Sequence, residues 1–232
     1  DHRDLHSFPT RRSSDLPKID GLAVSLWYEE GLLSRGLTRG DGKTGELVTA
    51  NIKTIRSVPL KLMTEHPPKE FEVRGEVYFS RAEFEKINKD RKSRGEDRFA
   101  NPRNAAAGTL KLLDPQLVSQ RKLDFFAHSL GYHDLSFKTH WEALQLFKEW
   151  GLPINPLVQK ARNISEVIEI CRSWMGKQRG LAYDIDGLVI KVDDLSLRER
   201  LGQTTHAPRW VDRKSTRLNS SDETPSRMPS SA

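Results

Sequence analysis

Stretches in which apolar and polar residues alternate with a period of two most limit the folds that this chain of 232 residues can adopt. From Ile19 the alternation continues to Tyr28, Gly31 marks a turn, and a second apolar stretch follows it. Such alternation is typical of a strand with one buried face, and a turn between two such runs predicts an antiparallel hairpin. Residues 71–79 and 185–192 show further strand patterns.

Helical patterns lie between these strands. Ser80 with Glu83, and Thr139 with Glu142, match the capping box that opens many helices, and a third helix is expected to start near Ser165. The strands and helices do not follow the strand–helix–strand rhythm of a parallel sheet. The sequence therefore predicts an α+β fold in which antiparallel sheets are flanked by helices.

Composition divides the chain into a domain and two tails. Residues 17–211 carry the periodic patterns, whereas residues 1–16 and 212–232 are rich in Ser, Thr, Arg and Pro and are expected to be disordered or foreign. The single cysteine, Cys171, excludes a disulfide framework and a cysteine-based metal cluster within this chain. This cysteine usage suits a reducing cytosol, and no apolar run approaches the ~20 residues of a membrane span.

The charge is mildly basic, with a formal net charge of +6 and a pI of about 9.4. The two tails are almost balanced, so the excess belongs to the domain. Proteins that meet phosphate-rich partners often carry such an excess. An ordinary scatter of charges in a protein without such partners remains an alternative.

A lysine in the motif Pro-Lys-Ile-Asp-Gly, Lys18, is the candidate nucleophile. Lysine amines react only after losing a proton, and burial or neighbouring cations can make that loss easier. The tetrapeptide that follows Pro17 also fits a simple turn at a strand edge with a solvated lysine. The chemical interpretation therefore depends on the motifs that follow.

Six motifs follow one another along the chain: PKIDG (17–21), TRGDGKTGE with VTAN (38–51), EVRGEVY (72–78), FANPRNAAAGTLK (99–111), YDIDGLVIKV (183–192) and LGQTTHAPRW (201–210). In this order they resemble the adenylation domain of bacterial NAD-dependent DNA ligases over roughly residues 17–210. The first and fifth motifs alone would admit any nucleotidyltransferase of the ligase and capping-enzyme superfamily. The TRGDG and NPRNAAAG segments are specific to the NAD-dependent branch. The resemblance implies a nucleotidyltransferase, ATP-grasp-like fold.

The resemblance also implies a role for each matching residue. Lys18 would attack the α-phosphorus of NAD, expel nicotinamide mononucleotide and become an AMP–lysine. Arg39 would lie near the phosphate and nucleotide, where a guanidinium fork suits phosphate oxygens. Glu76 would accept hydrogen bonds from the ribose hydroxyls, and Lys191 would neutralise the α-phosphate.

The remaining matches are Asp186, Arg103, Lys111 and His128. Asp186 and Lys191 are five residues apart, which on a regular strand puts them on opposite faces. We therefore expect Asp186 in a turn, where it would act on the nucleophile or on a metal. Arg103 and Lys111 would face the departing nicotinamide mononucleotide or the phosphates of nicked DNA. His128 would either stack on adenine or be a buried core histidine.

The implied substrate and partner are NAD and nicked double-stranded DNA, with Mg²⁺ to polarise phosphate oxygens. No metal-ligating residue is predicted in this chain, and zinc is expected only in a separate downstream module. We expect a monomer in the bacterial cytoplasm. An ATP-dependent ligase or capping enzyme, and a non-catalytic nucleic-acid-binding domain, remain as alternatives.

Three positions depart from the family pattern. Leu16 stands where a glutamate is usual, Ser215 stands where a second phosphate-neutralising lysine is expected, and Leu47 replaces an acidic residue. The family's upstream domain, which recognises the nicotinamide mononucleotide half of NAD, and its downstream domains are not in this sequence. We expect this polypeptide alone to adenylate slowly from NAD and not to seal nicks.

Overall fold

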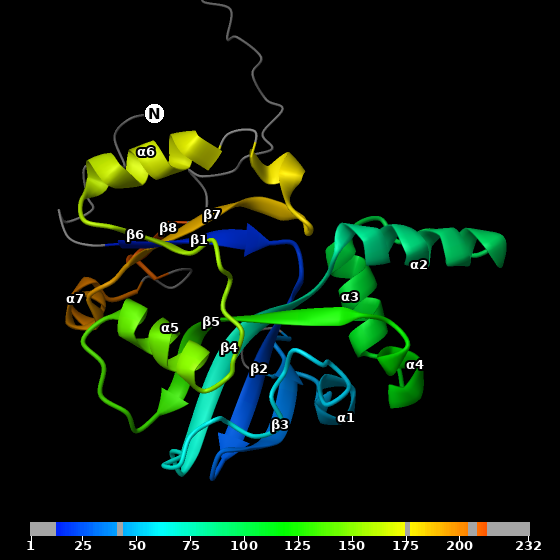
Figure 1. Ribbon diagram of the computed structural model, residues 1–232, viewed down its shortest axis with the longest axis horizontal. Coiled ribbons are helices and arrows are strands. Elements are labelled where there is room, and N and C mark those ends of the chain that lie inside the picture. Colours follow the sequence, from blue (N-terminus) through cyan, green and yellow to red (C-terminus); the bar gives the residue numbers. More distant parts are fainter. Residues whose placement is uncertain (1–12, 41–43, 175–176, 204–207, 213–232) are drawn as a thin grey trace, which may run out of the picture.

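The computed structural model describes residues 13–40, 44–174, 177–203 and 208–212, and these residues contain two four-stranded antiparallel sheets (Figure 1). Sheet A has the order β6-β1-β7-β8, with β1 Ser13–Ile19, β6 Gln159–Ala161, β7 Ile185–Val192 and β8 Val211–Asp212. Sheet B has the order β3-β2-β4-β5, with β2 Leu22–Glu29, β3 Leu32–Thr38, β4 Glu70–Phe79 and β5 Leu123–His133.

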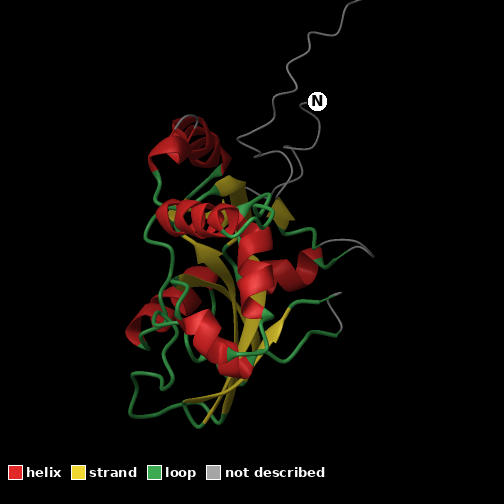
Figure 2. Ribbon diagram, turned by 90° about the vertical axis from the view of Figure 1, so that its right-hand side faces the viewer, coloured by secondary structure: helices red, strands yellow, loops and turns green. Residues whose placement is uncertain are grey.

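Helices surround the strands, as the view turned by 90° makes clear (Figure 2). They are α1 Thr49–Ile52, α2 Arg81–Ser93, α3 Pro102–Leu110, α4 Pro115–Ser119, α5 His140–Glu149, α6 Ile164–Trp174 and α7 Leu195–Leu201, with a 3₁₀ turn over Lys177–Gly180. The α+β prediction with antiparallel sheets is confirmed.

Local signals explain where several elements begin. The β2–β3 hairpin turns at Gly31, which has a φ of +77°, a conformation that glycine adopts without strain. Ser80 accepts a hydrogen bond from the Glu83 amide at the start of α2, and Thr139 forms a complete capping box with Glu142 at the start of α5. The predicted hairpin and helix starts are therefore confirmed.

The main core lies between one face of sheet B and the helices α1, α3 and α5. Leu26, Phe71, Phe125 and Phe147 are among its most enclosed large side chains, each at most 1% exposed. Burial of this much apolar area is the dominant force that holds the helices against the sheet.

A second, smaller core joins the two sheets. Tyr78 and Phe126 on sheet B stack on each other, and both contact the ring of Tyr183, which precedes β7. Ile185 of β7 belongs to the same cluster. Helix α6 lies on the side of sheet A that faces away from sheet B. Aromatic contacts therefore hold the two sheets together at this junction.

Sheet A begins earlier than the sequence indicated. β1 starts at Ser13, four residues before the domain boundary that was expected at Pro17. Residues 13–15 pair with β6, and residues 13–16 pair with β7. The other end of the sheet reaches Asp212 in β8. The rest of the two expected tails lies outside the described residues.

Candidate active site

The ion pair between Lys18 and Asp186 is the centre of the site. Lys18 on β1 lies opposite Gly187 on β7, whereas Ile19 lies opposite Ile185, so β7 carries one extra residue at Asp186. Such a β-bulge bends the strand and re-aims a side chain. Lys18 Nζ donates to Asp186 Oδ2 across 2.5 Å.

The prediction that Asp186 lies in a turn is wrong, because Asp186 lies within β7. The bulge interrupts the alternation of side chains between the two faces of β7, which is the effect that a turn was expected to have. The odd spacing between Asp186 and Lys191 therefore does not force their side chains onto opposite faces of the sheet.

Lys191 lies on the same face as Lys18. It is opposite Ser14 in the β1–β7 ladder, and residues paired across an antiparallel ladder share a face. Ser14 and Lys18 are four residues apart on one strand, so they share that face as well. Lys191 is only 5% exposed, and its Nζ donates to the main-chain carbonyl oxygen of His128 at 2.9 Å.

Sheet B contributes Glu76 and His128. His128 Nε2 lies 3.8 Å from Glu76 Oε2, and His128 Nδ1 lies 2.8 Å from the hydroxyl of Ser129. The side chain of His128 is 34% exposed, so it is not a fully buried core histidine. Its ring therefore remains accessible beside the glutamate, and stacking on adenine stays a prediction.

The turn after Lys18 brings three of the motifs together. A Cβ atom on Gly21 would lie 2.5 Å from the Val77 carbonyl oxygen and 2.8 Å from Cγ of Glu76, which is closer than a side chain tolerates. The amide of Asp20 donates to the carbonyl oxygen of Asp184. Glycine is therefore required where the chain passes from β1 to β2 directly against Glu76.

Asp20 is a site residue that the sequence analysis missed. Burial raises the pKa of its carboxyl, the nearby charges of Asp186 and Asp184 raise it further, and the charges of Arg103 and Lys18 oppose the rise. Asp20 therefore belongs to the same electrostatic cluster as Lys18. Its place two residues after Lys18, within the same PKIDG motif, was the available signal.

Arg39 follows directly on β3. Its amide donates to the carbonyl oxygen of Ala23, and Ala23 lies opposite Glu76 in the β2–β4 ladder. Arg39 therefore joins the row of residues across sheet B that contains Glu76. Residues 41–43 of the same glycine-rich loop lie outside the described residues.

The two other predicted cations have different surroundings. Arg103 is exposed in the first turn of α3, close enough to Asp20 for its charge to lower the pKa of that carboxyl. Lys111 ends α3 and pairs with Glu46 at 2.7 Å, at the base of the glycine-rich loop. Arg103 therefore joins the cluster around Lys18, while the contact of Lys111 leads to the loop that follows Arg39.

One motif residue, Asn51, has a structural role. Its side-chain amide, in the VTAN segment, is buried and donates to the carbonyl oxygens of Leu110, the last residue of α3, and of Leu112. Leu47 is 68% exposed, so it replaces an acidic residue at a solvated position. Ser215 lies outside the described residues.

The described residues contain neither a metal-binding cluster nor a membrane-spanning helix. No group of three or more His, Cys, Asp or Glu side chains that could hold a metal ion is present among them. Within the same ranges, no helix has the length and apolar character needed to cross a membrane.

The two antiparallel sheets with their flanking helices form the fold of a nucleotidyltransferase domain. A family model described as the NAD-dependent DNA ligase adenylation domain matches residues 10–212, and the chain belongs to that family. The resemblance that the motifs carried is thereby confirmed.

Curated relatives agree with this assignment. The chain is 50% identical over 195 residues to a DNA ligase of Natranaerobius thermophilus and 51% identical over 199 residues to one of a Synechococcus strain, in both cases over 84% of this chain and 29% of the relative. A DNA ligase of Pelotomaculum thermopropionicum is 44% identical over 232 residues, or 91% of this chain and 34% of the relative. The chain thus spans about a third or less of the length of these ligases.

Proposed function

We propose that this chain is the domain on which an NAD-dependent DNA ligase forms its covalent AMP–lysine, with Lys18 as the nucleophile. The observation that carries the proposal is the 2.5 Å contact between Lys18 Nζ and Asp186 Oδ2 across the bulge. A lysine that merely lay at a solvated turn would need no such strand irregularity beside it. Bulges are common next to active sites because they re-aim a side chain.

The reaction transfers an adenylyl group. Lys18 Nζ loses a proton and forms a bond to the α-phosphorus of NAD, and the bond from that phosphorus to the leaving phosphate oxygen breaks. Nicotinamide mononucleotide departs with the electron pair of the broken bond. Asp186 orients the amine and is the carboxylate nearest to its proton.

Phosphoryl-type transfer depends on positioning and on compensation of charge. Lys191 supplies a cation on the face that carries Lys18, and its ammonium is anchored before substrate arrives by the carbonyl oxygen of His128. A preorganised cation needs little rearrangement as charge develops in the transition state. Lys191 therefore suits the role of neutralising the α-phosphate.

The nucleoside would lie along sheet B. Glu76 presents a carboxylate that can accept from ribose hydroxyls, and the partly exposed ring of His128 beside it offers a flat face for adenine. Arg39 extends the same row across the sheet and would meet phosphate oxygens. Arg103 and Lys111 would face nicotinamide mononucleotide or DNA phosphates.

The residues around Lys18 fit a magnesium ion that stays mainly on substrate phosphates. Mg²⁺ commonly uses only one or two carboxylates together with phosphate oxygens and water. Burial raises the pKa of Asp20 and the neighbouring charge of Asp186 raises it further, and a cation beside these two carboxylates would stabilise their charged forms. When bound there, Mg²⁺ would neutralise charge on the phosphate oxygens.

In the complete ligase, AMP would pass to the 5′-phosphate of a DNA nick, and the 3′-hydroxyl would then attack to seal it. The basic domain would contact DNA mainly through phosphates, so we expect binding to weaken steeply with salt. We expect the protein to act as a monomer inside the bacterial cell.

The test is covalent labelling with NAD that carries radioactive phosphorus in its AMP half. The 232-residue chain is assayed alone and after fusion to the flanking domains of a relative's ligase. We expect label on the fused wild type, much less on the chain alone, and none on Lys18→Ala. Lys122→Ala, which alters an exposed lysine away from the site, should label normally.

Three outcomes would contradict the proposal. Equal labelling of Lys18→Ala would show that another residue is the nucleophile. Labelling from ATP but not from NAD would select an ATP-dependent ligase or capping enzyme. Absence of label from both nucleotides in the fused protein would select a non-catalytic nucleic-acid-binding domain.

A further inference from the structure

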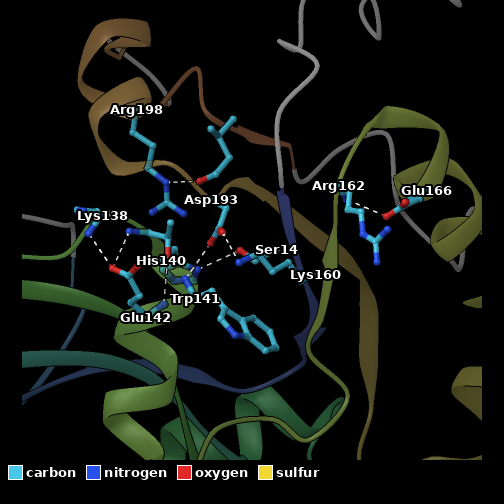
Figure 3. A network of polar contacts seen from close by, with 12 residues as sticks. Ser14, Lys138, His140, Trp141, Glu142, Lys160, Arg162, Glu166, Asp193 and Arg198 are labelled. Atoms are coloured by element: carbon cyan, nitrogen blue, oxygen red, sulfur yellow. Dashed lines mark hydrogen bonds and ion pairs between the residues drawn. The ribbon is translucent and has the colours of Figure 1, made fainter.

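His140, the first residue of α5, is a buried histidine that the proposed mechanism does not use. It is 1% exposed and lies among Ser14, Asp193 and Trp141 in the polar network of Figure 3. Its Nδ1 is 3.0 Å from the hydroxyl oxygen of Ser14, and its Nε2 is 3.0 Å from the carbonyl oxygen of His128.

These two neighbours define the tautomer of the ring. A carbonyl oxygen can only accept, so Nε2 carries the hydrogen and donates to His128. Nδ1 is then the unprotonated nitrogen and accepts from the hydroxyl of Ser14. Burial lowers the pKa of His140 well below its ordinary value, and the charges of Lys191 and Arg198 lower it further, so the ring is neutral.

The carbonyl oxygen of His128 has a second donor. Lys191 Nζ donates to it at 2.9 Å, so His140 and Lys191 share one acceptor. A carbonyl oxygen has two lone pairs and can accept from both at once. This oxygen is therefore one anchor of the Lys191 ammonium, and it is the anchor that His140 also contacts.

His140 also contacts the chain on the C-terminal side of Lys191. Its amide donates to the carbonyl oxygen of Asp193, two residues beyond Lys191, and the next amide, that of Trp141, donates to Asp193 Oδ1 at 2.8 Å. Asp193 is fully buried and forms an ion pair with Lys160 at 3.2 Å. The first turn of α5 is thus hydrogen-bonded to Asp193, two residues after Lys191 and directly after the end of β7.

We propose that His140 is a positioning residue for adenylyl transfer: by donating from Nε2 to the His128 carbonyl oxygen, it fixes the acceptor that anchors Lys191 Nζ and so aims the Lys191 charge at the nucleotide phosphate. The same contact fixes the backbone of β5 at His128, whose ring lies beside Glu76. The chemical meaning of this inference rests on the proposed function, whereas the hydrogen bond itself does not.

Two substitutions separate the donor from the bulk of the side chain. His140→Gln keeps a side-chain N–H that can reach the carbonyl oxygen, and His140→Met has a similar length without a donor. In the fused ligase at saturating NAD, we expect His140→Met to slow AMP–lysine formation about 10- to 100-fold with less than a ~3-fold change in KM, and His140→Gln to stay within ~5-fold of wild type.

A double-variant comparison shows whether His140 acts through Lys191. Adding His140→Met to Lys191→Met should change the remaining rate by less than ~2-fold, because coupled residues are not additive. An equal loss from His140→Met in both backgrounds would overturn the proposal, and so would a His140→Gln variant as slow as His140→Met. Melting temperatures of all variants separate loss of folding from loss of rate.

Nitrogen-15 NMR of the 232-residue chain tests the contact without any turnover. We expect the His140 ring to show a hydrogen on Nε2 alone at pH 7, and the Lys191 ammonium signal to shift in His140→Met but not in His140→Gln. A hydrogen on Nδ1 alone, a protonated ring, or an unchanged Lys191 signal in His140→Met would overturn the proposal. If wild type forms no AMP–lysine, the proposed function fails, while these signals still decide the positioning role.

Discussion

Asp186 shows how one inserted residue can place a functional group. The bulge at Asp186 brings its carboxylate to the amine of Lys18, and both side chains are more than a third exposed. An ion pair at such exposure contributes little to stability, with typical values of about 0–1 kcal/mol. If Lys18 is the nucleophile, as proposed, the value of the pair lies in orienting its amine.

Replacing Asp186 by asparagine should separate the effect of the carboxylate's negative charge from the effect of its shape. Asp186→Asn keeps an oxygen that can accept from Lys18 but loses the negative charge and the capacity to take a proton. We expect AMP–lysine formation in the fused ligase to slow about 10²-fold, the lower range for a lost proton-transfer group, with little change in melting temperature. Asp134→Asn, at an exposed position beyond β5, is the matched control. A rate within twofold of wild type would remove Asp186 from the mechanism.

Glu72 makes stability depend on pH. Burial alone would raise the pKa of its carboxyl, but hydrogen bonds from Arg74, Ser25 and the Tyr132 amide outweigh burial, so the pKa is lowered. A carboxyl whose pKa is lower in the folded state contributes stability at pH values above its ordinary pKa. That contribution is lost as the pH falls through the folded-state value.

Glu72→Gln should therefore be destabilising in a pH-dependent way. We expect the free energy of unfolding at pH 7 to fall by about 1–3 kcal/mol, because the amide leaves buried donors without a carboxylate. The difference from wild type should shrink below pH ~4, where wild type loses the same charge. Urea titrations at several pH values measure it, with Glu85→Gln on the exposed side of α2 as control. A difference that stays constant with pH would contradict the assignment.

At the scale of elements, the β1–β2 connection depends on glycine. A side chain on Gly21 would press on the backbone of β4 and on Glu76. We expect Gly21→Ala to cost about 1–3 kcal/mol of unfolding free energy, the usual range for overpacking, and to slow adenylylation by displacing Glu76. Gly180→Ala is the control, because a Cβ there meets nothing within 4 Å. Equal stability of the two variants in thermal unfolding would show that β1 and β2 can move apart without loss.

Elements whose sequence signals lie within a few residues of one another could be predicted from the sequence. Contacts between residues that are distant in the sequence could not. The β2–β3 hairpin and the capped start of α5 follow from periodicity and capping residues that lie close together in sequence. The bulge at Asp186 arises only when β7 meets β1, and the role of His140 only when α5 meets Ser14. Neither arrangement leaves a pattern in its own neighbourhood of the sequence.

The start of β1 was missed for the same reason. Residues 13–16 contain two serines, an aspartate and a single leucine, a composition that resembles a loop. Their partners in β6 and β7 lie about 150 residues or more further along the chain. Motif resemblance predicts roles for Lys18, Glu76 and Lys191, but it did not indicate Asp20.

At the scale of the molecule, sheet A combines the first strand with strands from the last third of the domain. Deleting residues 1–16 would remove every β1–β6 pair and the four β1–β7 pairs before Pro17. We expect that deletion to abolish cooperative unfolding of sheet A or lower the melting temperature by about 10 °C or more, on the scale of several lost kcal/mol.

Deleting residues 1–12 is the control, because it leaves all of these pairs in place. Its melting temperature should stay within ~2 °C of wild type. Circular dichroism melts of the two truncations compare them directly. If both truncations melted like the full chain, pairing of residues 13–16 would be dispensable to the fold.

The strand order has a consequence during synthesis. A ribosome makes Lys18 near the beginning of this domain and Asp186 and Lys191 near its end, 168 and 173 residues later. Proteins fold from the N-terminus as they emerge, but contacts this distant in sequence must wait for the last segment. A nascent chain that has exposed the lysine therefore has neither its carboxylate partner nor the second cation. Under the proposed function, the amine of Lys18 becomes reactive only in a nearly complete domain. Interrupted translation products would then contain Lys18 but could not form AMP–lysine.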